Sequence, residues 1–220
     1  MGGIRARRPR MNIAIIGAGN VGGALAASLT KAGHSVTISS RDPEDAADLA
    51  KRTGATAAAS SEAAVSGAEA VILAVPFQAV GGLGAELRAA LEGKVVVDVT
   101  NRVDPEDPGQ TLDGTSVAEQ LQAQVPGARV VKAFNTVFAS NQADPMVEGR
   151  ELDGFVAADD QEAKEAVLGL ADSIGFRPID AGPLAMARAL EAMAALNIIL
   201  QLKNDWSWQT GWKLIGPTEA

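Results

Sequence analysis

The fold is decided by one stretch near the start of the chain, residues 12–41, which reads NIAIIGAGNVGGALAASLTKAGHSVTISSR. It begins with a short apolar run and a glycine turn, continues with apolar residues at helical spacing from Val21 to Ala32, and ends with an alternating run from Ser35 to Ser40. This pattern predicts a strand, a tight turn, a helix and a second strand, which together make a βαβ unit.

The turn in this unit fits the pattern G-x-G-x-x-G over residues 17–22. The first glycine permits the tight turn, the second lets backbone N–H groups approach a pyrophosphate, and the third lets the helix pack closely on the strand. A glycine turn without a ligand has the same letters, but the position between a strand and a helix favours a dinucleotide site with the anion at the helix N-terminus. We therefore assign to the cofactor site Gly17, Gly19, Asn20, Val21 and Gly22.

The residues after the second strand indicate which dinucleotide is bound. NAD-selective domains place an acidic residue there, about 20 positions past the first glycine, to hold the ribose 2′-hydroxyl. This chain has Ser39, Ser40 and Arg41 instead, two hydroxyls and a guanidinium that can hold a 2′-phosphate. NADP(H) is the predicted cofactor. The alternative is that Arg41 is a solvated surface residue and that Asp42 binds the ribose.

The rest of the chain alternates strand and helix patterns. Strands are expected near Thr56 and over residues 70–74, 94–99, 129–133, 154–158 and 176–180. The alternation predicts an α/β fold of the Rossmann type, a doubly wound parallel sheet with a short C-terminal helical appendage. We expect a disordered tail over residues 1–11, with Met1 and Met11 as alternative starts, an NADP-binding domain over residues 12–183, and a helix with a tryptophan-rich tail over residues 184–220.

Two later strands end in segments suited to the nicotinamide half of the cofactor. Ligands of open α/β sheets bind at the carboxyl ends of strands, which makes Ala74, Val75, Pro76 and Asn101 further candidates. Asp98 either belongs to this site or caps a loop, and the sequence leaves both open. The irregular segment over residues 101–114 is longer than a simple connection and is expected to border the site.

Composition excludes several classes of function. The net charge of -8 disfavours nucleic acid and acidic membrane surfaces, and the absence of cysteine excludes thiolate chemistry and disulfides. No uninterrupted apolar run approaches the roughly 20 residues of a membrane span. We expect a cytoplasmic protein with a small-molecule substrate.

Acid–base residues are scarce in this chain. There is no tyrosine, and the single histidine, His34, lies in a turn on the amino side of the sheet. Lys132 is expected at the start of its strand, at the wrong end for catalysis. We assign no catalytic side chain and no metal ligand, and a ring cofactor that needs little proton transfer suits the sequence as hydride acceptor.

From about Asn12 to Arg188 the chain resembles the coenzyme F420-dependent NADP reductases and, more loosely, the cytosolic reductase domain of the six-transmembrane ferric reductases. Besides the glycine motif and Ser40-Arg41, the resemblance rests on KAFNT at 132–136, FVAADD at 155–160, RPIDAGPL at 177–184, and Arg188. It implies reversible hydride transfer between NADPH and a deazaflavin, coenzyme F420. A flavin such as FMN or FAD is the other acceptor that we expect. The resemblance also implies that Asn135 and Thr136 border the ring pocket and that Pro183 and Leu184 close it.

The chain departs from this family at two places. Archaeal members carry a histidine where this chain has Asn135, so the contacts to the ring are expected to differ. The tail with Trp206, Trp208 and Trp212 is not typical of these reductases. Its tryptophans either stack on a flat substrate or, the interpretation we favour, bury against a partner subunit, giving a homodimer through the C-terminal helix.

Three other functions remain open at this stage. Imine or small-carbonyl reductases share the N-terminal domain, but they usually carry a larger helical domain than the segment that follows Leu184. Ferric reduction follows from the looser resemblance. A protein that senses the NADP redox state without turnover would need the same NADP-binding residues but no catalytic activity.

The cofactor assignment is tested by the substitution Arg41→Glu. Because it replaces a guanidinium by a carboxylate next to the expected 2′-phosphate, it should weaken NADPH binding far more than NADH binding. Titration of both nucleotides measures this difference. Equal losses for NADPH and NADH would contradict the assignment.

Overall fold

The structure is a computed structural model that describes residues 10–103 and 114–218. Most of the tail expected over residues 1–11 and most of the loop expected over residues 101–114 lie outside the described residues. The remaining predictions can be compared with the structure.

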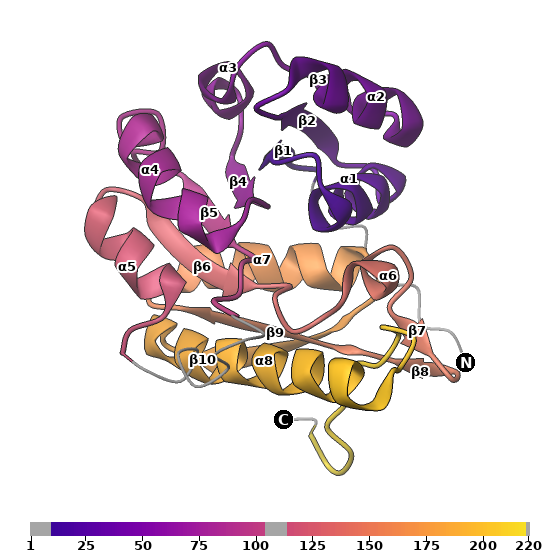
Figure 1. The fold of residues 1–220 in the computed structure, drawn as a ribbon. Coiled ribbons are helices and arrows are strands. Elements are labelled where there is room, and N and C mark those ends of the chain that lie inside the picture. Colours follow the sequence, from indigo (N-terminus) through magenta and orange to yellow (C-terminus); the bar gives the residue numbers. More distant parts are fainter. Residues whose placement is uncertain (1–9, 104–113, 219–220) are drawn as a thin grey trace.

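The described chain alternates strands and helices along most of its length (Figure 1). The strands are β1 (Asn12–Ile16), β2 (Ser35–Ser39), β3 (Thr56–Ala57), β4 (Ala70–Leu73), β5 (Val95–Asp98), β6 (Arg129–Ala133), β7 (Met146–Val147), β8 (Arg150–Glu151), β9 (Asp153–Ala158) and β10 (Arg177–Gly182). The helices are α1 (Asn20–Lys31), α2 (Pro43–Thr53), α3 (Ser61–Ser66), α4 (Phe77–Leu87), α5 (Val117–Gln124), α6 (Ala139–Gln142), α7 (Gln161–Ser173), the 3-10 turn η2 (Leu184–Met186) and α8 (Ala187–Asn204).

The central sheet has eight strands in the order β10-β9-β6-β5-β4-β1-β2-β3. From β1 the chain moves outward through β2 and β3, then returns to β4 on the other side of β1 and continues to β5 and β6. Neighbours among β1 to β6 are parallel. The Rossmann-type, doubly wound fold predicted from the sequence is confirmed, with its switch point between β1 and β4.

One part of the fold prediction is wrong, because the sheet is not parallel throughout. Strand β9 runs antiparallel to β6, and β10 is parallel to β9. A parallel neighbour needs a long crossover, usually a full helix. Between β6 and β9 the chain forms only the four-residue α6 and the β7–β8 hairpin, so it turns at the carboxyl edge and comes back in the opposite direction.

Alternate residues of the strands bury two hydrophobic layers, one on each face of the sheet. Ile13 and Ile15 of β1 face the layer covered by α1, α2 and α7, whereas Ala14 and Ile16 face the layer covered by α3, α4 and α5 (Figure 1). This alternation is what a strand that is buried on both faces requires.

The C-terminal segment packs as part of the same body. Leu184 is buried in the layer with α4 and α5, and Leu190 of α8 packs on Phe155 and Ala157 of β9. By length and composition alone, Leu184–Asn204 could cross a membrane, with a mean hydropathy of 1.3, although 44% of that window is buried. The search for an uninterrupted apolar run in the sequence did not detect this helix, because isolated polar residues divide its apolar sequence. Helices in protein cores pass the same test.

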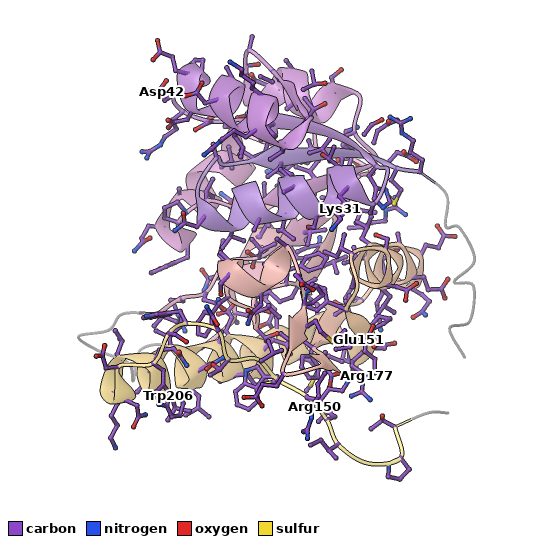
Figure 2. The ribbon with its side chains drawn as sticks, turned by 90° about the vertical axis from the view of Figure 1, so that its right-hand side faces the viewer. Lys31, Asp42, Arg150, Glu151, Arg177 and Trp206 are labelled. Atoms are coloured by element: carbon purple, nitrogen blue, oxygen red, sulfur yellow. The ribbon has the colours of Figure 1, made fainter. Side chains whose placement is uncertain are left out.

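The tryptophan-rich tail folds back on its own chain. The backbone N–H of Asp153 donates to the carbonyl oxygen of Trp212 at 3.0 Å, and Trp212 packs beside Phe155. The Trp208 ring meets Phe138 edge-on at 5.2 Å between centroids. Figure 2 shows Trp206 far from Asp42, at opposite ends of the molecule. The tail therefore lies against the start of β9.

A charged anchor holds this tail in position. Asp153 is wholly buried, and Arg177 donates to both of its carboxylate oxygens at 2.6 Å. Burial alone would raise the pKa of Asp153, but the bonds from Arg177, Leu214 and Lys213 lower it. Arg177 also donates to the carbonyl oxygen of Leu214 at 2.9 Å.

The pair between Glu119 of α5 and Arg188 of α8 predicts a pH dependence of stability. Hydrogen bonds from Arg188 lower the pKa of Glu119 from 4.5 to about 2, so the pair stabilises the fold above pH 4.5 and loses this effect as the pH falls toward 2. Because Arg188 is 53% exposed, solvent screens the pair, and we expect its contribution to stability to be small. Urea unfolding of the wild type and of Arg188→Met should show a difference at neutral pH that shrinks in acid. A difference independent of pH would contradict this.

Candidate nucleotide-binding site

A cleft of about 800 Å³ opens at the switch point of the sheet. It is bounded by the loop after β1, the end of β2, the segment after β4 and one side of α4. Seven of the residues assigned to the cofactor from the sequence line it, namely Gly17, Gly19, Ser40, Arg41, Ala74, Val75 and Pro76.

Glycine is needed at two positions for this cleft to exist. A Cβ on Gly17 would lie 2.2 Å from the carbonyl oxygen of Ala74, and Gly17 has a φ of +118°. A Cβ on Gly22 would lie 2.1 Å from the carbonyl oxygen of Gly17. The first turn of α1 therefore approaches the ends of β1 and β4 as closely as backbones allow.

The amino end of α1 is left open toward a ligand. Gly19 is the N-cap residue, no side chain caps the helix, and a Cβ on Gly19 would have no atom within 4 Å. Uncapped N–H groups and the helix dipole make this end suited to a phosphate anion. Asn20 is exposed at the first position of the helix, and Val21 packs partly against the core.

Ser40 and Arg41 mark the far end of the cleft. Both also line an adjoining hollow of about 410 Å³, together with Asp42, Pro43 and Asp45. Arg41 makes no hydrogen bond or ion pair with the described residues, so its guanidinium is available to an anion. Asp42 caps α2 by accepting the backbone N–H of Glu44 at 2.9 Å, which argues against the alternative that it binds the ribose.

Ser39 lies behind the cleft instead of lining it. It is 1% exposed, and its hydroxyl group is 3.1 Å from the hydroxyl group of Ser61. Ser61, at the start of α3, lines the cleft and was not expected from the sequence. Other lining residues that were not expected from the sequence come from α2 and α4, namely Asp45, Gln78 and Glu86.

The residues expected around a second ring separate into two groups. Asn101 donates to the backbone carbonyl oxygen of Asn135 at 2.8 Å and accepts from its side chain at 2.8 Å, and neither residue lines the cleft. Asn135 also donates to the carbonyl oxygen of Leu190 at 3.0 Å, while its Oδ1 is buried without a hydrogen-bond partner among the described residues. Thr136 is 4% exposed. These residues sit where β5, β6 and α8 meet.

Pro183 and Leu184 do not line the cleft. Pro183 is exposed, and the backbone N–H of Leu184 donates to Asp159 at 2.9 Å while its side chain is buried in the core. Because β10 runs in the reversed direction of β9, it does not end at the carboxyl edge of β1 to β6. The expectation that Leu184 closes a ring pocket does not agree with this burial.

The prediction for Lys132 was wrong. Lys132 is the fourth of five residues in β6, close to its carboxyl end, and it is fully buried. Its ammonium group donates to Asp98 Oδ2 at 2.8 Å, to the carbonyl oxygen of Thr100 at 2.6 Å and to Glu191 Oε1 at 2.8 Å. Burial raises the pKa of Glu191. A buried ionic cluster therefore lies at the carboxyl edge, and Asp98, whose role was open, belongs to it.

Comparison with known proteins identifies the family. A family model described as NADP oxidoreductase, coenzyme F420-dependent, matches residues 12–102. The F420-dependent NADP reductase of Methanothermobacter marburgensis is 35% identical over 217 residues, which cover 88% of this chain and 94% of that protein. The chain belongs to the F420-dependent NADP reductase family. This confirms the resemblance inferred from the sequence and the class of NADP-dependent oxidoreductase.

Two further relatives of this NADP reductase family member extend the comparison. A solved structure described as an F420-dependent NADP reductase, from Arthrobacter sp. FB24, matches with a TM-score of 0.83 at 30% identity, over 94% of this chain and 100% of that one. Metalloreductase STEAP3 of Rattus norvegicus is 35% identical over 199 residues, which cover 90% of this chain. The chain spans only 38% of the length of that metalloreductase.

The role of the glycine turn is tested by Gly17→Ala. The added methyl group would meet the carbonyl oxygen of Ala74 in a backbone conformation that alanine rarely adopts, so we expect a loss of about 2–4 kcal/mol in unfolding free energy and weaker NADPH binding. Gly33→Ala is the matched control, since Gly33 has a φ of +95° but open space around it. The control should lose about 1 kcal/mol and keep its NADPH affinity. Equal effects of the two substitutions would contradict the close-approach argument.

Proposed function

We propose that this protein transfers hydride between NADP(H) and a deazaflavin, coenzyme F420, or a flavin-type acceptor. The observation that carries the proposal is the position of Arg41, whose unengaged guanidinium lies in the same cleft as the open amino end of α1. This spacing of two anion sites along one cleft suits a dinucleotide with an additional 2′-phosphate.

The residues that would hold NADP(H) form three groups, each of which would contact a different part of the cofactor. Gly17, Gly19 and the first turn of α1, including Asn20, Val21 and Gly22, would hold the pyrophosphate. Ser40 and Arg41, with Ser39 supporting them from behind, would hold the 2′-phosphate. Ala74, Val75 and Pro76 would border the nicotinamide end. When bound, NADPH supplies a hydride, and these residues keep it in position and exclude water.

We place the acceptor at the carboxyl edge beside β5 and β6. Asn101, Asn135 and Thr136 are gathered there, and the unpartnered Oδ1 of Asn135 can accept a hydrogen bond from a ring N–H or amide group. Residues 12–183 would then carry the NADP site, while α8 forms one wall of the acceptor side through Leu190 and Glu191.

A deazaflavin is favoured over a ferric acceptor for one reason. The F420-dependent reductase relative is covered over 94% of its length, whereas the metalloreductase relative is covered over 38%. The metalloreductase relative supports ferric reduction as a second candidate function. Among the described residues no group of three or more His, Asp or Glu side chains could hold a metal ion.

We further propose that the protein is cytoplasmic and forms a homodimer through the outer side of α8. Leu196 and Leu202 on this helix are 50% and 53% exposed, so the helix offers apolar surface to a second copy. The tryptophan tail is not needed for this contact, since Trp212 packs within its own chain.

The proposed activity is tested by offering several acceptors to the purified protein with NADPH. Coenzyme F420, FMN, FAD and a ferric chelate are supplied in parallel, and the loss of NADPH absorbance is followed. We expect coenzyme F420 to be reduced with the highest kcat/KM, because a relative that the chain covers over 94% of its length is an F420-dependent NADP reductase. Turnover with the ferric chelate alone would favour the second candidate. Tight NADPH binding without any turnover would contradict both and favour a redox sensor.

A further inference from the structure

The buried cluster of Asp98, Lys132 and Glu191 has an imbalance of charge. Its three side chains are 0%, 0% and 1% exposed. If all three were ionised, one ammonium would face two carboxylates, and a net negative charge would be buried at low dielectric constant. Burying an uncompensated charge is costly, and two carboxylates that share a site cannot both stay ionised easily.

The hydrogen bonds show which carboxylate is better satisfied. Asp98 accepts three bonds, from Lys132 on Oδ2 and from the backbone N–H and hydroxyl of Thr100 on Oδ1, at 2.9 and 2.7 Å. All three N–H groups of the Lys132 ammonium are used. Asp98 is therefore the more fully hydrogen-bonded of the two carboxylates.

Glu191 is less fully satisfied. Its Oε1 accepts from Lys132 and from the backbone N–H of Val117 at 2.9 Å, whereas its Oε2 has no hydrogen bond to the described residues. Glu191 also lines a small hollow of about 220 Å³ whose wall includes Arg102, Ser116 and Arg188. A proton on Oε2 would balance the cluster, and the hollow gives that proton a route to solvent.

The cluster joins the elements that form the acceptor side. Through Asp98 and the carbonyl oxygen of Thr100 it fixes the turn that leads into Asn101. Through Glu191 it fastens α8 one residue after Leu190, whose carbonyl oxygen accepts from Asn135. A change of charge here would shift the Asn101–Asn135 pair, with little effect on the glycine turn at the opposite side of β4.

We propose that Asp98, Lys132 and Glu191 form a positioning network for the acceptor side of the site, and that Glu191 carries a proton in the working enzyme. The proposal rests on the proposed hydride transfer and deepens it. The neutral form of Glu191 keeps α8 seated against β5 and β6. Ionisation of Glu191 leaves a net negative charge in the cluster and loosens that contact.

The direction of the pH effect follows from the groups around Glu191. Lys132 and Asp98 face it from the sheet, Arg102 and Arg188 line the same hollow, and Glu119 pairs with Arg188 from α5. Burial raises the pKa of Glu191, so its protonated form persists above the ordinary carboxyl range. As the pH rises through this raised pKa, the wild type should lose stability and acceptor kcat/KM together.

The experiment compares Glu191→Gln, Glu191→Leu and Lys132→Met with the wild type in the full chain. The matched control is Lys164→Met, which removes another largely buried lysine. Lys164 lies in α7 and pairs with Asp180 of β10 at 3.1 Å. Each variant is measured for NADPH Kd, acceptor kcat and KM against pH, and Tm. Infrared difference spectra of the wild type against Glu191→Gln report a protonated carboxyl group without any acceptor.

We expect the variants to change acceptor kinetics much more than NADPH binding. Lys132→Met and Glu191→Leu should lower acceptor kcat/KM by about tenfold or more while NADPH Kd changes by less than about twofold, because only the acceptor side shifts. Glu191→Gln, which imitates the neutral acid, should lose far less than Glu191→Leu and should remove the decline at high pH. The infrared spectrum should contain a protonated carboxyl band that Glu191→Gln lacks. Lys164→Met should leave acceptor kinetics unchanged.

Several results would overturn the proposal. Without the carboxyl band, or if Glu191→Gln is as damaging as Glu191→Leu, Glu191 is ionised and the proton assignment is wrong. If NADPH affinity and acceptor kinetics fall in parallel with Tm in every variant, the cluster is only structural. If the wild type reduces no acceptor, the proposed function and the positioning role both fail, and the infrared spectrum alone still decides whether Glu191 carries a proton.

Discussion

The close approach of the β1 loop to the end of β4 is the constraint on which the site depends. Gly17 comes so near the carbonyl oxygen of Ala74 that no side chain fits between them, and Gly22 brings α1 equally near to Gly17. Because these backbones touch, the open end of α1, the end of β2 and the start of α4 share one cleft. A looser turn would move the helix away from the edge and separate the phosphate site from Arg41.

Arg41 and Lys132 differ in burial and in how many of their N–H groups are already hydrogen-bonded. Arg41 is exposed and uncommitted, which costs little in water and leaves its full charge for a ligand. Lys132 is buried, so its charge must be matched by the protein, and its three N–H groups are all spent on Asp98, Thr100 and Glu191. In the proposed function, Arg41 would bind the 2′-phosphate, whereas Lys132 joins β5, β6 and α8 through its hydrogen bonds.

The cofactor half of the molecule could be predicted from the sequence because its determinants are local. The glycine turn, the first helix and Ser40-Arg41 all lie within one βαβ unit, and strand and helix periodicity fixes their order. Periodicity does not give the direction of a strand, which is why the reversal at β9 and the burial of Leu184 were missed. The cluster was missed because Lys132 is 34 positions from Asp98 and 59 from Glu191, and no local pattern connects them.

The NADP side and the acceptor side of the site differ in how much of each lies within the segment that the family model matches. The family model matches residues 12–102, which include the cleft but not Lys132, Asn135 or Glu191. In the proposed function, the acceptor side takes Asp98 and Asn101 from the end of that segment, and its other residues come from β6 and α8, which follow it. In the proposed function, residues close together in the sequence would hold NADP(H), whereas dispersed residues would shape the acceptor side, so the acceptor could change with little effect on NADP(H) binding. Relatives that are named for coenzyme F420 in one case and for metal reduction in another, each 35% identical to this chain, are what such a division would produce.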